Sequence, residues 1–121
     1  MRWCLATILI LLAGPAHAGP PSFNCAAEHS AVGRLICSDE ELSTLDGEVF
    51  GGLNAWRSNV EGEERDIRNI SHGNWIRERN ERCGLLWLSP DTPLETLMAA
   101  RPCMLKAYQD RKKFYDSVMW R

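Results

Sequence analysis

The sequence predicts an all-α fold: a small helical bundle of three to five helices around one long central helix, held together by two disulfides and preceded by a cleaved signal peptide. Three observations carry this prediction. Apolar residues recur every three or four positions between residues 42 and 60, the cysteines beyond the amino-terminal segment are even in number, and no stretch shows convincing β-strand alternation. We therefore expect helices joined by short turns.

The first 18 residues have the pattern of a secretory signal peptide. Arg2 supplies a positive charge, residues 5–12 are apolar, and Ala16-His17-Ala18 is a small-residue cleavage site. The apolar run is short for a bilayer span, so a retained membrane anchor is the less favoured alternative. We expect residues 1–18 to be removed and residues 19–121 to form a single domain, periplasmic or secreted, with no membrane insertion in the mature form.

The mature segment contains four cysteines, and an even number in a small exported protein indicates two disulfides. Four cysteines allow three pairings. We favour the neighbouring pairing, Cys25 with Cys37 and Cys83 with Cys103, because it closes two short loops. A metal site is the rival interpretation. The segment has no C-x-x-C motif and its histidines lack ligand spacing to a cysteine, so no metal is expected.

The balance of charges excludes one class of partner. Removing Arg2 from the 14 basic residues leaves 13 against 16 acidic ones, a net charge of −3 with histidine neutral. A nucleic-acid-binding domain presents a concentrated basic face, which this mildly acidic segment lacks. We expect no nucleic-acid partner, whereas a cationic protein would be weakly attracted.

The long central helix is predicted to fill residues 38–60. Ser38 and Glu41 match an S-x-x-E capping box, in which the two side chains satisfy free amides at a helix start. Gly47 and Gly51, four positions apart, indicate either a close approach by another helix or a tolerated weakness. The helix carries an apolar stripe that must be buried against other segments: Leu42, Leu45, Val49, Leu53, Trp56 and Val60.

Other helices are predicted on both sides of the central one. The pattern indicates a short helix at residues 26–36 and a longer one at residues 63–83, whose charged end is expected to be solvated rather than to bind a partner. Thr92-Pro93-Leu94-Glu95 is a second capping signature, with proline at the first helical position, and it starts a short helix ending near residue 101. The last helix is expected to begin at about Cys103.

No pattern of catalytic residues is present. The chain lacks nucleophile-elbow, zinc-protease and phosphate-loop motifs, and Ser71 and His72 are adjacent, so their side chains point apart on a helix. The acidic clusters at residues 39–41 and 61–64 are simpler to explain as helix starts than as paired catalytic carboxylates. We expect no enzyme activity and no cofactor.

Five short motifs follow one another along the mature segment: Phe23-x-Cys25, Ile36-Cys37, Leu42-x-x-Leu45-Asp46, Trp75-Ile76-x-x-Arg79 before Cys83, and Cys103-x4-Tyr108-x2-Arg111. Their order, together with four cysteines, resembles the LprI-type lysozyme inhibitor family over residues 22 to about 115. The resemblance implies an exported, helical protein stapled by the neighbouring cysteine pairings. It also implies inhibition of lysozyme.

The chain departs from that family's pattern in several places. Leu53 stands where tyrosine is usual, His72 stands where glutamine is expected, and the segment before Cys83 is one residue longer. The insert between Cys83 and Cys103 is also longer than typical, and it carries Trp87. These differences leave the predicted scaffold intact and alter one end of the molecule.

The resemblance therefore predicts a protein partner, lysozyme. In this hypothesis the disulfide-closed insert enters the acidic cleft of the enzyme, with Trp87 as apolar anchor and Arg82 or Arg101 as the charge that faces the cleft carboxylates. The other tryptophans, and the leucines of residues 85–88, are expected to pack onto the helices instead. The alternative is a non-enzymatic interaction or immunity module that binds a different protein of the cell envelope.

Overall fold

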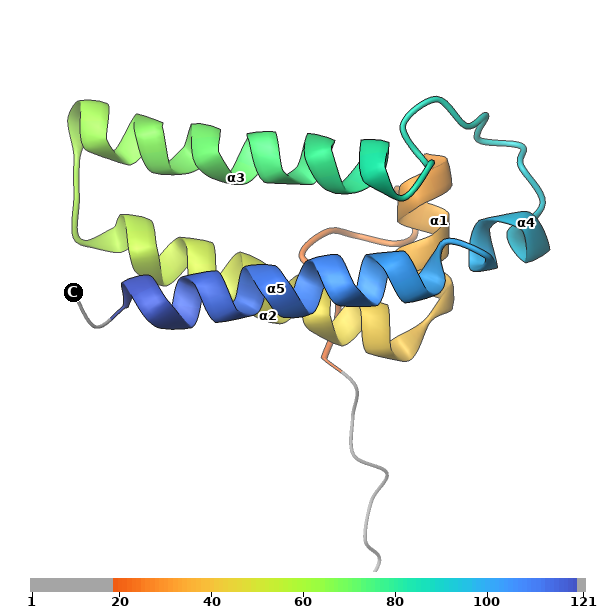
Figure 1. Cartoon of the computed structure of the whole chain (residues 1–121), viewed down its shortest axis with the longest axis horizontal. Coiled ribbons are helices and arrows are strands. Elements are labelled where there is room, and N and C mark those ends of the chain that lie inside the picture. Colours follow the sequence, from red (N-terminus) through yellow and green to blue (C-terminus); the bar gives the residue numbers. More distant parts are fainter. Residues whose placement is uncertain (1–18, 120–121) are drawn as a thin grey trace, which may run out of the picture.

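Five helices make up the part of the chain that the computed structural model describes, residues 19–119. They are α1 (Ala31–Ser38), α2 (Glu40–Ser58), α3 (Gly62–Arg82), α4 (Leu94–Met98) and α5 (Arg101–Val118). Figure 1 shows α2, α3 and α5 lying lengthwise, with α1 and α4 at the end where α2 and α5 begin. The all-α prediction is confirmed for this part of the chain, whereas the predicted signal peptide lies outside the described residues.

The three long helices have fixed relative directions. Side-chain contacts between α2 and α5 join residues 62 to 64 positions apart, as in Asp46 with Tyr108 and Glu48 with Lys112, so these two helices are parallel. After a short turn α3 runs in the opposite direction and contacts both of them (Figure 1). Within residues 19–119, no helix combines the length and the apolarity that a membrane span requires.

The core lies where α2 and α5 face each other and α1. Leu42, Val49 and Leu53 of the predicted stripe are buried, and Leu45 and Trp56 are partly buried, so the stripe is confirmed up to the last turn of α2. Burial of such side chains is the main favourable term in folding. Buried side chains from the other helices complete the core: Leu35, Ile36, Leu97, Met104, Tyr108 and Tyr115.

Two glycines of α2 allow close packing, and they serve different neighbours. A side chain at Gly52 would meet the Tyr115 ring at 2.8 Å, so α5 packs tightly against α2 at this position. A side chain at Gly47 would clash with the backbone carbonyl of Pro20, in the segment before α1. Nothing lies within 4 Å of a side chain built at Gly51, so this glycine weakens the helix without serving a contact. The close approach of another helix occurs at Gly52 rather than at the predicted pair, Gly47 and Gly51.

The predicted capping box at the start of the central helix is wrong. Ser38 is the last residue of α1, and its hydroxyl donates to the Leu35 carbonyl at 2.8 Å. Asp39 caps α2 instead, because its backbone is extended and its carboxylate accepts from the Leu42 amide at 3.0 Å. A capping residue needs a non-helical backbone, which Ser38 does not have while it belongs to α1.

Other boundaries also differ from the sequence prediction. The first helix begins at Ala31 rather than at residue 26, because the Ser30 hydroxyl accepts from an amide of the first turn at 3.0 Å. The bounds of α3 lie within one residue of the prediction. Pro93 precedes α4 instead of opening it, and α5 starts two residues early, at Arg101.

Both predicted disulfides are present. Cys25–Cys37 ties the segment before α1 to the last turn of that helix, and Cys83–Cys103 ties the end of α3 to the first turn of α5. Such bonds persist in oxidising compartments, which agrees with a protein located outside the cytoplasm. The second bridge also fixes the two ends of the α3–α4 connection and α4.

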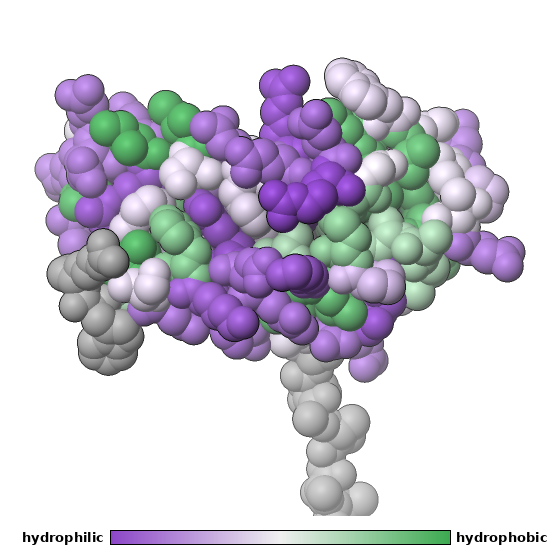
Figure 2. Space-filling model, in the orientation of Figure 1, coloured by the Kyte–Doolittle hydropathy of each residue, from purple (hydrophilic) through white to green (hydrophobic). Residues whose placement is uncertain are grey.

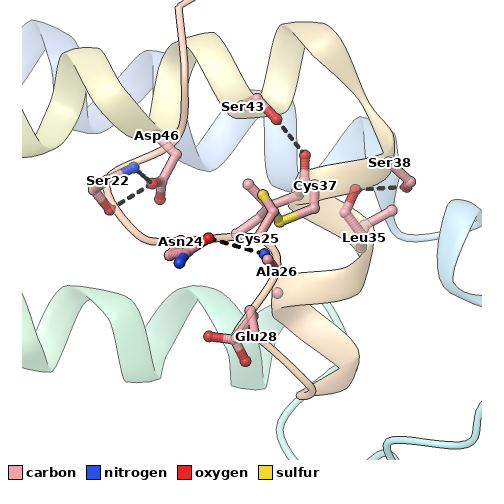
Figure 3. The surroundings of a disulfide bond; sticks show 12 residues. Ser22, Asn24, Cys25, Ala26, Glu28, Leu35, Cys37, Ser38, Ser43 and Asp46 are labelled. Carbon is pink, nitrogen blue, oxygen red and sulfur yellow. Dashed lines mark hydrogen bonds between the residues drawn. A yellow bond between two sulfur atoms is a disulfide. The ribbon is translucent and has the colours of Figure 1, made fainter.

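The segment before α1 is held by hydrogen bonds as well as by its bridge (Figure 3). The Asn24 side chain accepts from the Ala26 amide at 3.0 Å. The Asp46 carboxylate of α2 accepts from the amide and the hydroxyl of Ser22, at 2.7 and 2.6 Å. Ser43 of α2 donates its hydroxyl to a carbonyl of α1 at 2.6 Å. The amino-terminal segment is therefore fixed to both α1 and α2.

A chain of buried hydrogen bonds links the three long helices, and we call it the buried polar chain. The Tyr108 hydroxyl of α5 donates to Asp46 of α2 at 2.7 Å and accepts from the Arg79 guanidinium of α3 at 2.8 Å. All three side chains are buried. The guanidinium stacks on the Tyr108 and Trp75 rings, and burial lowers the pKa of Arg79 and raises that of Tyr108.

The position of α3 depends on this chain because the helix has little apolar surface to bury. Only His72 and Arg79 are buried among its 21 residues. Trp75 is partly buried against the core, while Ile67 and Ile70 are exposed. Polar contacts and one disulfide therefore supply most of what holds α3 against α2 and α5.

Loss of the second disulfide should weaken the whole fold. Replacing Cys83 and Cys103 with serine should lower the free energy of unfolding by about 2–4 kcal/mol, because the unfolded chain regains the freedom of a closed loop. Urea denaturation of the oxidised proteins measures this. Reduced wild-type protein, which lacks both bridges, should be less stable still. A serine variant as stable as the oxidised wild type would contradict the prediction.

Candidate functional site

Four exposed apolar residues belong to the part of the chain that connects the end of α3 to the start of α5. We call them the α3–α4 surface: Trp87, Leu88, Leu94 and Met98. Trp87 is 87% exposed, which is unusual for so large an apolar side chain. Figure 2 shows hydrophobic residues gathered at the end that carries this connection and α4. Large exposed apolar side chains that gather at one end of a molecule are typical of a protein-binding site.

The neighbours of these residues anchor the surface to the core. Leu85 and Leu97, which are 3% and 0% exposed, lie before and after most of the exposed residues along the chain. The expectation that the leucines of residues 85–88 pack onto the helices is therefore correct for Leu85, whereas Leu86 is half-buried and Leu88 is 38% exposed. Gly84, at a φ of 72°, makes the turn that directs the chain away from α3.

Arg34 of α1 holds the middle of the connection. Its Nη1 donates to the backbone carbonyls of Pro90 and Thr92, at 2.5 and 2.6 Å. Since α1 is itself fixed by a disulfide, these bonds tie the connection to a rigid support. The segment that carries Trp87 is thus fixed at its ends by the second bridge and in its middle by Arg34, while the side chains of Trp87 and Leu88 remain in solvent.

Neither of the two predicted arginines lines the surface hollow that contains Trp87. This hollow, of about 160 Å³, is lined by Glu81, Gly84, Leu86, Trp87 and Leu88. Arg82 is exposed and lines a separate hollow between α3 and α5. The role of either arginine as a cleft-facing charge remains a prediction.

Arg101 is engaged with carboxylates of this same chain. Its Nε pairs with Asp39 at 2.5 Å, and its Nη2 pairs with Glu41 at 2.8 Å. Burial raises the pKa of Asp39, but the hydrogen bonds from Arg101 and the Leu42 amide outweigh burial and lower it overall. Arg101 therefore joins the start of α5 to the cap of α2, and a partner would have to compete with these two carboxylates.

A second polar cluster lies between α3 and α5, around His72. The His72 ring is 8% exposed, and its Nδ1 lies 2.6 Å from the Tyr115 hydroxyl. Arg111 donates to the same hydroxyl at 3.2 Å. Burial and the positive charges of Arg111, Arg79 and Arg57 lower the pKa of His72 to about 4, against the opposing effect of Asp46.

The described residues contain no arrangement that would hold a metal. Within residues 19–119, no three His, Cys, Asp or Glu side chains lie close enough together to bind an ion. The four cysteines are consumed by disulfides, and His72 is hydrogen-bonded inside the protein.

No family model, curated protein sequence or solved structure matches the chain. The site is therefore defined by the geometry of this chain, and the family resemblance remains a hypothesis.

Sequence reasoning found Trp87 but missed most of its surroundings. The short helix was predicted to extend to about residue 101, but α4 has only five residues and buries Leu97 alone. The Arg34 contacts join residues 56 and 58 positions apart, and no local pattern indicates such a pair. The signal in the sequence for exposed apolar side chains is that the predicted helix within the insert between Cys83 and Cys103 is short.

Acid should destabilise the protein through His72. Its pKa is about 4 in the folded protein and 6.5 without the fold, so the unfolded state takes up the proton first as the pH falls. The stability that depends on neutral His72 should be fully present above pH 6.5 and should decrease by about 3 kcal/mol as the pH approaches 4, because each pKa unit is worth about 1.4 kcal/mol. Denaturation curves at several pH values measure this decrease.

The matched variant is His72→Gln, which keeps a hydrogen-bonding side chain that does not titrate. Carboxylates also titrate near pH 4, but they do so equally in both proteins, so the difference between the two curves isolates His72. Equal slopes of stability against pH in both proteins would contradict the assignment.

Proposed function

We propose that the mature chain is an exported, non-enzymatic protein of the LprI lysozyme-inhibitor type, which binds lysozyme in the periplasm or after secretion. The observation that carries the proposal is the exposed Trp87 on a disulfide-closed connection. Tryptophan and arginine contribute most often to the binding energy of protein interfaces. The predicted signal peptide and the two disulfides support the exported location.

The rigidity of the connection supports binding rather than catalysis. A side chain held in place before binding loses little conformational freedom when the complex forms, which favours affinity. The second bridge and the Arg34 bonds give Trp87 such a support. His72, a candidate base by residue type, is buried against Tyr115 and does not line the hollow beside Trp87.

Charge supports the choice of a cationic partner. The mature segment has a net charge of −3, so a basic enzyme such as lysozyme is attracted towards it. Of the two predicted arginines, Arg82 is the more available for the carboxylates of the cleft, because Arg101 is already paired with Asp39 and Glu41. We propose Trp87 as the anchor and Arg82 as its charged companion.

Lysozyme activity provides the test. The purified mature protein should slow the lysis of a cell-wall suspension by lysozyme in a dose-dependent way. Trp87→Ala should weaken the inhibition by about 30-fold or more, as loss of a central anchor does. Met119→Ala is the control, since Met119 is 51% exposed at the other end of α5. Both variants should unfold at the wild-type urea concentration.

Unchanged lysis in the presence of a large excess of folded protein would overturn the proposal. The alternative is then a non-enzymatic interaction or immunity module with a different envelope protein, which the same exposed Trp87 would serve. Affinity capture from envelope extracts with wild-type and Trp87→Ala protein identifies that partner, because the specific one is retained by the wild type alone.

A further inference from the structure

A groove of about 390 Å³ runs between α3 and α5, on a different part of the molecule from the α3–α4 surface. Its apolar lining comes from Ile67 and Ile70, which are 52% and 60% exposed, and from the edge of Trp75. Its polar lining comes mainly from Glu78 and Arg111. Neither isoleucine has a packing partner in the core of residues 19–119.

Arg111 is a guanidinium held rigidly without a carboxylate. It lies over the Phe114 and Tyr115 rings at 4.3 and 4.8 Å, and over the Trp75 ring at 5.6 Å. Its Nη2 donates over 3.2 Å to the hydroxyls of Ser71 and Tyr115, which are neutral acceptors. None of the ion pairs within residues 19–119 includes Arg111.

The hydrogen-bonding capacity of Arg111 is also unused in part. Its Nε is buried and has no hydrogen-bond partner among the described residues. A partly buried guanidinium normally pairs with an anion, because removing its charge from water is costly unless hydrogen bonds replace the solvent. By contrast, Arg101 makes two ion pairs and Arg68 makes one. Because the buried Nε is not accessible from the groove, Nη1 is the atom that would meet a ligand, and it makes no hydrogen bond among residues 19–119.

We propose that this groove binds the carboxylate end of a short peptide, with the carboxylate on Arg111 and a small aliphatic side chain against Ile67 and Ile70. Guanidinium and carboxylate form strong charge-assisted hydrogen bonds. Asn74 and Glu78, which line the same groove, offer a donor and acceptors to the peptide amides. The inference is independent of lysozyme inhibition, since the groove shares no lining residue with the hollow beside Trp87.

The negative charge of Glu78 selects among anions. A phosphate dianion would meet this carboxylate in the same groove, whereas a carboxylate ligand carries a single charge and is repelled less. The exposed isoleucines favour a ligand with an apolar group beside its charge, so a bare inorganic anion would use only part of the site. Charge and lining together therefore indicate a peptide carboxylate.

The test is a titration of the full mature protein, followed by the amide signals in a heteronuclear NMR spectrum. The probes are acetyl-alanyl-alanine, the same peptide with its carboxylate converted to an amide, acetate, and inorganic phosphate. The peptide acid should give saturable shifts around Ser71, Asn74 and Arg111. The amide and acetate should each bind about tenfold more weakly or worse, because each lacks one half of the recognition.

Two variants locate the binding. Arg111→Gln should reduce the affinity for the peptide acid by about tenfold or more. Lys113→Gln is the matched control, because it removes the same charge two residues further along α5, on another side of the helix, and it should bind like the wild type. If Arg111→Gln does not fold, the comparison of acid with amide on the wild-type protein remains decisive.

Several outcomes would overturn the proposal. Binding of the peptide amide as tightly as the peptide acid would contradict it, and so would binding of phosphate or acetate as tightly as the peptide acid. The same holds for chemical-shift changes confined to residues outside the groove, or a titration that does not saturate at millimolar peptide. An unchanged affinity in a folded Arg111→Gln variant would equally remove Arg111 from the site.

Discussion

The buried polar chain of Asp46, Tyr108 and Arg79 is the interaction on which the rest of the structure depends. It places a carboxylate of α2, a hydroxyl of α5 and a guanidinium of α3 in one line of hydrogen bonds. Breaking such a line removes a buried hydrogen bond to a charged group, at a typical cost of about 1.5–3 kcal/mol. Because α3 buries only His72 and Arg79, no apolar face of its own would hold it in place.

This dependence divides the molecule into a scaffold and a surface. Asp46, Arg79 and Tyr108 belong to the motifs that resemble the lysozyme-inhibitor family. All three side chains are buried and form hydrogen bonds that hold the helices together. The resemblance therefore bears on the scaffold, while recognition is proposed for groups outside it. Trp87 extends from the insert that follows α3, and Arg111 borders the groove beside α3, so the placement of α3 sets the geometry of both.

The sequence predicts well what depends on local periodicity and poorly what depends on contacts between distant residues. The stripe of α2 follows from spacing alone, and the disulfides follow from cysteine number and loop length. The predicted cap of α2 is wrong because Ser38 and Asp39 are both suitable capping residues. Only the position where α1 ends decides between them. The hydrogen-bond partners of Arg101 and Arg34 lie more than 50 residues away along the chain. No local sequence pattern therefore shows that Arg101 is paired with Asp39, or that Arg34 holds the connection that carries Trp87.

A double-mutant cycle between Asp46→Asn and Arg79→Gln tests the central claim most directly. The two side chains meet only through the Tyr108 hydroxyl, so the account predicts a coupling energy of at least about 1 kcal/mol in urea denaturation. The exposed pair Glu48 and Lys112, which also joins α2 to α5, should couple by well under 1 kcal/mol. Destabilisations by Asp46→Asn and Arg79→Gln that simply add would contradict the account.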